Sequence, residues 1–171
     1  MTIRKTTATI AAITMLTVGA CAKKAPDTLP PAPDGTGTTD TGAGTGTGVV
    51  PGSQEDFVAT VSSDRIFFYL DQYNVDAQDQ TTLQSQAQWL ARYPAVRVTL
   101  EGHADERGTR DYNIALGERR ANAAKNYLAS LGVDSNRIQV ISYGKERPAA
   151  LGSNEEAWAQ NRRAVTVVIG N

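Results

Sequence analysis

The sequence predicts an α/β fold, a two-layer sandwich in which helices cover a mixed β-sheet. From residue 65 onward, short β-rich runs alternate with segments of helical periodicity. The hydrophobic content of 40% in 171 residues is sufficient for one modest core. The predicted order is strand, helix, strand, helix, strand, a short helix and a final strand.

Four elements are predicted in the first half of the folded part. They are a short helix over 54–60, a strand over 65–70 ended by Asp71, a helix with Leu83, Ala87 and Leu90 on one face, and a strand over 96–101. Pro94 ends this helix, because proline lacks the N–H that a helix interior requires. Strict alternation in the second strand indicates one buried face.

The second half contains the longest predicted element, a helix from 109 to 131 that ends at Gly132. A strand over 137–142, a loop over 143–148, a capping box over 153–156 that opens a short helix, and a strand over 164–169 complete the fold.

The long helix has an arginine on its apolar stripe. At about 100° per residue, one stripe contains Asn113, Leu116, Arg120, Ala124, Tyr127 and Leu131. A buried arginine is unfavourable unless something pairs with it. Two interpretations follow, a structural ion pair with Asp105 or a socket for a small zwitterionic ligand.

The charge pattern favours a ligand that carries both signs. The formal net charge of −1 gives no electrostatic case for nucleic acid. Between residues 101 and 120, five acidic and four basic residues are interspersed. A polyanion would select for a basic surface, so this pattern fits a zwitterion better.

Residues 1–20 are predicted to be a lipoprotein signal peptide. Arg4 and Lys5 precede the mostly apolar residues 8–17, and small residues 18–20 lead to Cys21. This arrangement resembles a bacterial lipobox, in which the cysteine becomes the lipid attachment point. Ordinary secretory cleavage is the alternative, but Cys21 is the only cysteine and has no internal disulfide partner.

Residues 21–52 are predicted to form a lipidated cysteine followed by a disordered tether rich in proline, glycine and threonine. About 30 residues span roughly 30 Å as a coil and up to about 100 Å when extended. Residues 53–171 are the predicted folded domain.

Five motifs in this order carry a family resemblance: GHADERGT at 102–109, YN at 112–113, LGERRA at 116–121, SYGKERP at 142–148 and NRRAV at 161–165. They resemble the OmpA-like domain family, specifically its peptidoglycan-binding lipoproteins of Gram-negative bacteria, over about residues 65–169. The resemblance implies the βαβαβ(αβ) arrangement and a binding protein without a cofactor.

The resemblance implies non-covalent binding of peptidoglycan through the meso-diaminopimelate of its stem peptide. The family's ligand-binding aspartate and arginine fall on Asp105 and Arg120, and Asp71 matches a further binding-loop position. Without the resemblance, Asp71 is a turn-forming residue. Asn113 either supports the binding loop or packs in the stripe, and free amides near Thr109 can take anionic oxygen.

The resemblance also implies a place in the cell envelope. It implies lipid attachment to the outer membrane through Cys21, the periplasmic propeller protein TolB as a partner, and the Tol system of envelope integrity and cell division as context. A protein-interaction adaptor outside the Tol system is the alternative function.

Other polar and aromatic residues carry weaker signals. His103 is the only histidine, which argues against a multi-histidine metal site and favours a structural hydrogen-bonding role. Arg162 and Arg163 either buttress the site or form structural ion pairs, and Trp89 and Trp158 are predicted packing residues.

An enzyme is disfavoured by the placement of the acidic residues. Asp105 with Glu106 or Glu101 would have to act as a glycosidase pair. Residues so close on one loop seldom converge across one bond, and no nucleophile with a histidine partner forms an obvious motif.

Overall fold

The computed structural model describes residues 48–170. The predicted signal peptide (1–20), the lipidation site Cys21 and the tether up to residue 47 lie outside the described residues. Within 48–170, none of the helices combines the length and the apolar character that crossing a membrane requires.

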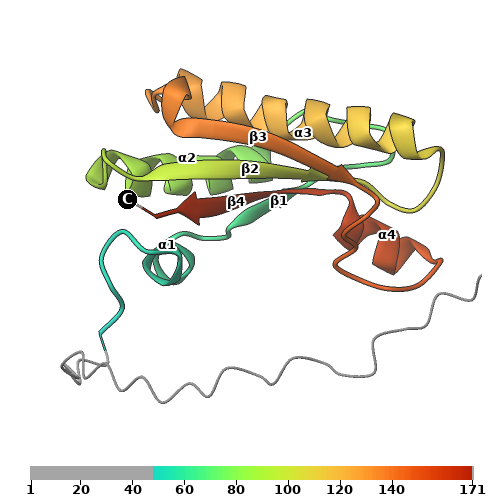
Figure 1. Ribbon diagram of the computed structural model, residues 1–171, viewed down its shortest axis with the longest axis horizontal. Helices are drawn as coiled ribbons and strands as arrows, with labels where there is room; N and C mark the ends of the chain where they lie inside the picture. Colours follow the sequence, from blue (N-terminus) through green and yellow to red (C-terminus); the bar gives the residue numbers. More distant parts are fainter. Residues whose placement is uncertain (1–47, 171) are drawn as a thin grey trace, which may run out of the picture. The chain divides into compact units, whose positions relative to one another are not determined.

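The predicted mixed sheet is confirmed. Its strands are β1 (Arg65–Phe67), β2 (Arg97–His103), β3 (Ile138–Gly144) and β4 (Arg163–Ile169), in the order β1-β4-β2-β3. β4 is antiparallel to both neighbours, whereas β2 and β3 are parallel. The helices are α1 (Gln54–Thr60), α2 (Ala77–Arg92), α3 (Arg110–Ser130) and α4 (Glu155–Asn161), with a 3₁₀ turn, η1, at Ser135–Arg137. Figure 1 shows α3 lying along β3 and β2, and α4 at the end of the sheet where β2 and β3 finish.

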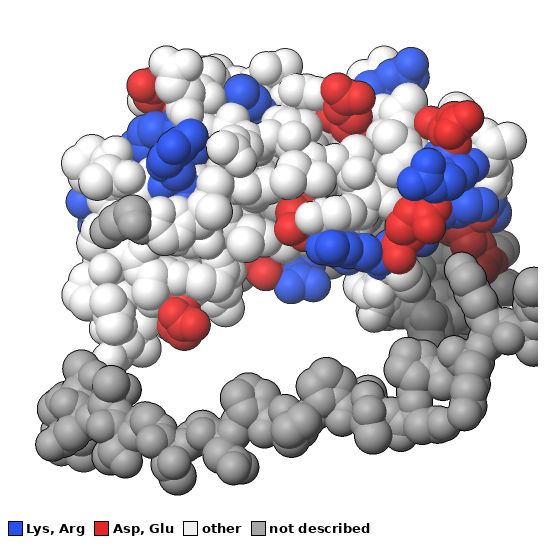
Figure 2. Space-filling view, viewed as in Figure 1, with Lys and Arg blue, Asp and Glu red and all other residues white. Residues whose placement is uncertain are grey.

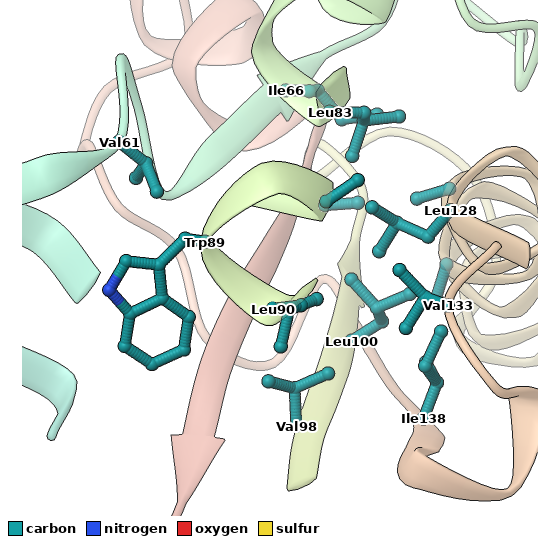
Figure 3. Packing of buried hydrophobic residues seen from close by; sticks show 14 of the residues in the cluster. Val61, Ile66, Leu83, Trp89, Leu90, Val98, Leu100, Leu128, Val133 and Ile138 are labelled. Carbon is teal, nitrogen blue, oxygen red and sulfur yellow. The ribbon is translucent and has the colours of Figure 1, made fainter. Parts of the chain in front are cut away.

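The core fills the space between α2, α3 and one face of the sheet. Figure 3 shows Leu90 of α2 and Leu128 of α3 facing Val98 and Leu100 of β2. Trp89 is fully buried, which confirms the prediction that it is a packing residue. The ring centroids of Trp89 and Phe57 lie 5.0 Å apart in an edge-to-face arrangement, so α1 is joined to the same core.

Two glycines allow α3 to approach β2 closely. A Cβ atom on Gly102 would collide with the backbone of Gly117, and one on Gly117 would collide with Ser142. Ser142 Oγ also donates a hydrogen bond to the carbonyl of Ile114 at 2.7 Å. This contact fixes the start of α3 against the sheet, and therefore fixes the position of Arg120 nearly two turns later.

Some element boundaries differ from the sequence predictions. β1 ends at Phe67, not at residue 70, because the next carbonyls turn away from β4 and accept hydrogen bonds from arginine side chains. Asn154 caps α4, with its side chain accepting from the Ala157 N–H, so Ser153 is not the N-cap. β3 continues to Gly144, because the N–H of Ala104 pairs with the Gly144 carbonyl.

The inward stripe of α3 is confirmed for Asn113, Leu116, Arg120 and Ala124, which are buried. Tyr127 is partly buried and packs against the core, whereas the prediction for Leu131 is wrong, since it is 40% exposed and Leu128 is buried instead. Leu131 is the C-cap residue after α3 ends at Ser130, so the helical period no longer sets the direction of its side chain.

Candidate functional site

A pocket of about 280 Å³ lies where β2 ends and α3 begins. Its walls come from the segment after β1, the β2–α3 loop and the first turns of α3. They are formed by Leu70, Asp71, Asp105, Arg107, Gly108, Tyr112, Asn113, Leu116 and Arg120. This volume is at the small end for ligand sites, and suits a fragment the size of one amino acid.

Arg120 is fully buried and is held by backbone carbonyls. Its Nε donates to Gln72 O at 2.8 Å, Nη1 to His103 O at 2.8 Å and Nη2 to Tyr69 O at 3.2 Å. A guanidinium carries five N–H groups, and these bonds use three of them. Two N–H groups remain to donate to a ligand in the pocket.

The charge of Arg120 has no direct partner. Within residues 48–170, no carboxylate oxygen lies within ion-pair distance of its nitrogens, so the first of the two interpretations, an Asp105–Arg120 ion pair, is not what the structure shows. Burial lowers the pKa of Arg120 to about 10, although Asp105 and Asp71 favour its charge from further away. A buried cation without a carboxylate is costly, and an anionic ligand group would remove that cost.

Asp105 is buried and pairs with two other arginines. Its Oδ1 accepts from the Arg107 backbone N–H and Nε, both at 3.1 Å, and its Oδ2 accepts from Arg107 Nη2 at 2.6 Å and Arg162 Nη1 at 3.4 Å. Burial raises the pKa of Asp105, but the hydrogen bonds from Arg107 outweigh burial and lower it. The carboxylate is therefore ionised and fully engaged.

Asp71 lies at the rim of the pocket in an unusual backbone conformation. Its φ of 54° is the one positive value at a non-glycine residue among residues 48–170. Such conformations persist where surrounding contacts enforce them, and here Tyr112 Oη donates to Asp71 Oδ1 at 3.0 Å. Asp71 is exposed, so its second oxygen is accessible to a ligand.

Of the two further predicted site residues, Asn113 lies in the pocket wall and Thr109 lies outside it. Asn113 lines the pocket and its Nδ2 donates to the Arg107 carbonyl at 2.7 Å, so it supports the binding loop. Thr109 does not line the pocket. Its hydroxyl caps α3 by accepting from the Tyr112 N–H at 3.3 Å.

The pocket is balanced in charge. Its walls carry two carboxylates, Asp71 and Asp105, and two guanidiniums, Arg107 and Arg120. Figure 2 shows charges of both signs gathered at the end of the molecule where α4 lies. A site of this kind favours a ligand with one cationic and one anionic group over a polyanion.

Arg107 is the residue that sequence reasoning missed. Its Cζ lies 4.0 Å from the ring centroid of Trp158, and its Nη2 donates to Asp105 Oδ2. The side chain is 34% exposed. Trp158 is thus more than a packing residue, since its Nε1 also donates to Glu106 Oε1. The adjacent Asp-Glu-Arg sequence was the available signal, but the loop conformation decides which charges meet.

Arg162 buttresses the site and is also a structural ion-pair residue. It is buried between α4 and β4, where Nη1 reaches Asp105 and Nη2 donates to Glu155 Oε1 at 2.6 Å. Its Nε donates to the Phe68 carbonyl. Arg163 is buried on the other face of the sheet and does not line the pocket.

His103 lies outside the pocket. It is buried, and neither ring nitrogen has a hydrogen-bond partner among residues 48–170, so the expected hydrogen-bonding role is wrong. Burial and the positive charges of Arg163 and Arg147 lower the pKa of His103 to about 4. In the same part of the chain, no cluster of three metal-ligating side chains is present.

The acidic residues considered for catalysis do not share one pocket. Asp105 faces the pocket at Arg120, whereas Glu106 lines a separate pocket beside Ala104 and Lys145. Glu101 lies on β2, with Oε2 3.7 Å from His103 Nε2. A glycosidase pair requires two carboxylates that flank one bond, so this geometry does not support one.

Comparison with known proteins identifies the family to which this fold belongs. The sequence profile of the OmpA family matches residues 67–162. A peptidoglycan-associated lipoprotein of Rhizobium meliloti is 51% identical over 169 residues, covering 99% of this chain and 91% of that protein. One from Brucella melitensis is 58% identical over 120 residues, covering 70% of this chain and 71% of its own.

A crystal structure of the peptidoglycan-associated lipoprotein from Burkholderia pseudomallei has a fold similar to that of this chain. It matches with a TM-score of 0.63 at 42% identity, covering 67% of this chain and all of that chain. The chain therefore belongs to the OmpA family and, within it, to the peptidoglycan-associated lipoproteins.

Proposed function

We propose that this protein binds peptidoglycan without covalent linkage, through the meso-diaminopimelate residue of its stem peptide. The observation that carries the proposal is Arg120, a fully buried guanidinium in a small pocket with two uncommitted N–H groups and no carboxylate partner among the described residues. The related proteins are named as peptidoglycan-associated, which supports peptidoglycan as the larger ligand.

The free end of a diaminopimelate side chain carries an ammonium and a carboxylate, which match the two charges of the pocket. The ligand carboxylate binds the two free N–H groups of Arg120. The ammonium lies between Asp105 and the accessible oxygen of Asp71. Buried charges then pair across the ligand, and the desolvation of Arg120 is compensated.

Arg107 has to move for this binding to occur. The oxygens of Asp105 already accept four hydrogen bonds, three of them from Arg107. A carboxylate offers about four acceptor positions, so a ligand ammonium must replace a guanidinium N–H. Arg107 is partly exposed and stacks on Trp158, so its side chain can release Asp105 without losing every contact.

The test compares two stem peptides that differ in one group. A peptide with lysine in place of diaminopimelate keeps the ammonium but lacks the side-chain carboxylate. We expect at least about 100-fold weaker binding of the lysine peptide, because Arg120 stays unpaired in its presence. Equal affinities by calorimetry would contradict the proposal.

We also propose binding without turnover. The match to a binding family and the separated carboxylates support this proposal. Purified sacculi should co-sediment with the protein and remain intact. Release of soluble glycan or peptide fragments would indicate a hydrolase instead.

Anchoring to the outer membrane through lipid on Cys21 completes the proposal. The lipobox-like residues 18–21 and the lipoprotein relatives support it. Cys21→Ser should remove the acyl chains seen by mass spectrometry, while the released protein still binds sacculi. Acyl chains that persist in this variant would contradict attachment at Cys21.

A protein partner at the same rim is the second candidate, and TolB of the Tol system, with its role in cell division, is the partner that the family resemblance implies. Four large side chains around the pocket are exposed: Tyr69, Leu70, Tyr73 and Tyr112. Tyrosines of this kind are frequent at protein interfaces. Pull-down of TolB should fall when excess diaminopimelate peptide is added, and unchanged capture would indicate separate sites or an adaptor role outside the Tol system.

A further inference from the structure

A second pocket, of about 360 Å³, lies next to the one at Arg120. Phe67, Phe68 and Tyr69 form an aromatic wall, and Asp79 and Arg162 contribute polar groups. Phe67 is 46% exposed and Tyr69 67% exposed, although both carry large apolar surfaces. Exposed aromatic surface beside a hollow is typical of a binding site.

Asp79 gives this pocket an unsatisfied acceptor. The side chain is 7% exposed, and Oδ1 accepts from the Phe67 N–H at 3.2 Å. Oδ2 is buried and has no hydrogen-bond partner among residues 48–170. Burial raises the pKa of Asp79 to about 6. A buried acceptor without a donor is costly, so a ligand that brings an N–H group gains affinity there.

The two pockets are separated by a single stretch of chain. Tyr69 lines the second pocket, while the next two residues, Leu70 and Asp71, line the first. Arg162 lines the second pocket, and its Nη1 reaches Asp105 in the first. Because the segment 69–71 and Arg162 contribute to both pockets, a ligand held at Arg120 has the second pocket on the other side of this segment.

We propose that the second pocket is a subsite for the part of peptidoglycan adjoining the residue at Arg120, with Asp79 Oδ2 accepting from a secondary amide N–H. This inference rests on the proposed function. The aromatic wall takes the small apolar group beside that amide. Two parts of peptidoglycan have this chemistry, the peptide bonds of the stem and the acetamido groups of the amino sugars.

The test measures NMR titrations of the whole protein with three probes. They are free meso-diaminopimelate, the stem tripeptide that ends in diaminopimelate, and the same tripeptide on its disaccharide. Asp79→Asn keeps an oxygen for the Phe67 N–H but places an amide donor where the free acceptor was. Asp134→Asn is the matched control, because Asp134 is an exposed cap in η1 far along the chain.

We expect Asp79→Asn to bind free diaminopimelate like the wild type and to bind at least one larger probe about tenfold more weakly. A loss that begins with the tripeptide assigns the subsite to a peptide amide, and a loss confined to the disaccharide probe assigns it to an acetamido group. Asp134→Asn should bind all three probes unchanged.

Two results would overturn the inference while leaving the proposed function intact. One is wild-type affinity of Asp79→Asn for all three probes, and the other is an equal loss for all three. If the wild type binds none of the probes, the proposed function fails as well. Should Asp79→Asn not fold, Tyr69→Ala replaces it, since this side chain is exposed. About threefold weaker binding of a larger probe is then expected, and unchanged binding overturns the subsite.

Discussion

Arg120 and Arg137 make the same kind of contact at opposite ends of the sheet. Each guanidinium donates three hydrogen bonds to backbone carbonyls, Arg120 to Tyr69, Gln72 and His103, and Arg137 to Leu90, Tyr93 and Val96. Arg137 is partly exposed to water, whereas Arg120 is fully buried and lines a pocket. An arginine can therefore hold three backbone carbonyls in place while its guanidinium remains partly exposed, as Arg137 does.

Arg162 completes the comparison, because it is buried like Arg120 but is paired with Asp105 and Glu155. A buried arginine with carboxylate partners is a structural ion pair. A buried arginine with carbonyls alone keeps a net charge in a low-dielectric site. Arg120 is buried without a carboxylate partner, unlike the partly exposed Arg137 and the paired Arg162. This difference indicates that the pocket at Arg120 binds an anionic group.

The largest expected effect separates Arg120 from Arg137. Arg120→Lys keeps the charge but loses the planar fork, so diaminopimelate-peptide binding should weaken by about 1.5–3 kcal/mol, or roughly tenfold to 150-fold. Arg137→Lys also loses hydrogen bonds to backbone carbonyls, so it should lower the unfolding free energy. It should leave binding per folded molecule unchanged. Calorimetry measures binding by both variants, and thermal unfolding measures their stability. Equal losses of binding in the two variants would contradict the distinction between Arg120 and Arg137.

Asp105 should show a mixed effect, because it serves both the ligand and two arginines. Asp105→Asn should weaken binding of peptides with a free amine by about 1.5 kcal/mol or more. It should also lower the melting temperature, since Arg107 and Arg162 lose an ionised partner. Glu155→Gln, which changes the exposed partner of Arg162, is the control and should change stability by less than about 1 kcal/mol. A depressed melting temperature with unchanged binding would make Asp105 a purely structural residue.

The smallest expected effect concerns pH, because two buried groups act in opposite directions. The folded protein holds His103 neutral down to about pH 4, while the unfolded chain protonates it near 6.5, so acidification disfavours the folded state. The folded protein protonates Asp79 at about pH 6 and the unfolded chain near 3.8, so acidification favours the folded state. Each contributes about 3 kcal/mol between pH 6.5 and 4, and together they nearly cancel.

The cancellation can be measured by removing one group. His103→Leu removes the contribution that disfavours the folded state on acidification, so the unfolding free energy should rise from pH 6.5 to 4 relative to the wild type. Urea unfolding at several pH values gives this slope. A variant whose slope equals that of the wild type would show that His103 does not titrate as its burial implies.

The helices and strands could be predicted because their signals are local. Periodicity placed Arg120 on the inward face of α3, and the segment of β-rich residues placed β2 and β4. Sheet order could not be predicted, since it depends on contacts between distant segments. The end of β1 was also missed, because the carbonyls after Phe67 bind arginines that lie far away in the sequence.

The pocket was only partly predictable for the same reason. The sequence identified Asp105 and Arg120 as site residues. It did not predict that Asp105 pairs with Arg107 whereas Arg120 binds backbone carbonyls. Arg107 reaches Asp105 because the chain turns between them, and the Asp105 carboxylate accepts both the Arg107 backbone N–H and its guanidinium. Such a turn is set by backbone conformation and packing, and residue types alone do not specify it.

The most direct test of the Arg120 socket is a cycle of four binding measurements. Wild type and Arg120→Lys are each titrated with the diaminopimelate peptide and with the lysine peptide. If Arg120 holds the ligand carboxylate, the wild type should prefer diaminopimelate at least about 100-fold, and Arg120→Lys should lose most of that preference. An Arg120→Lys variant that weakens both peptides equally, with the preference unchanged, would contradict the assignment and leave Arg120 as a brace like Arg137.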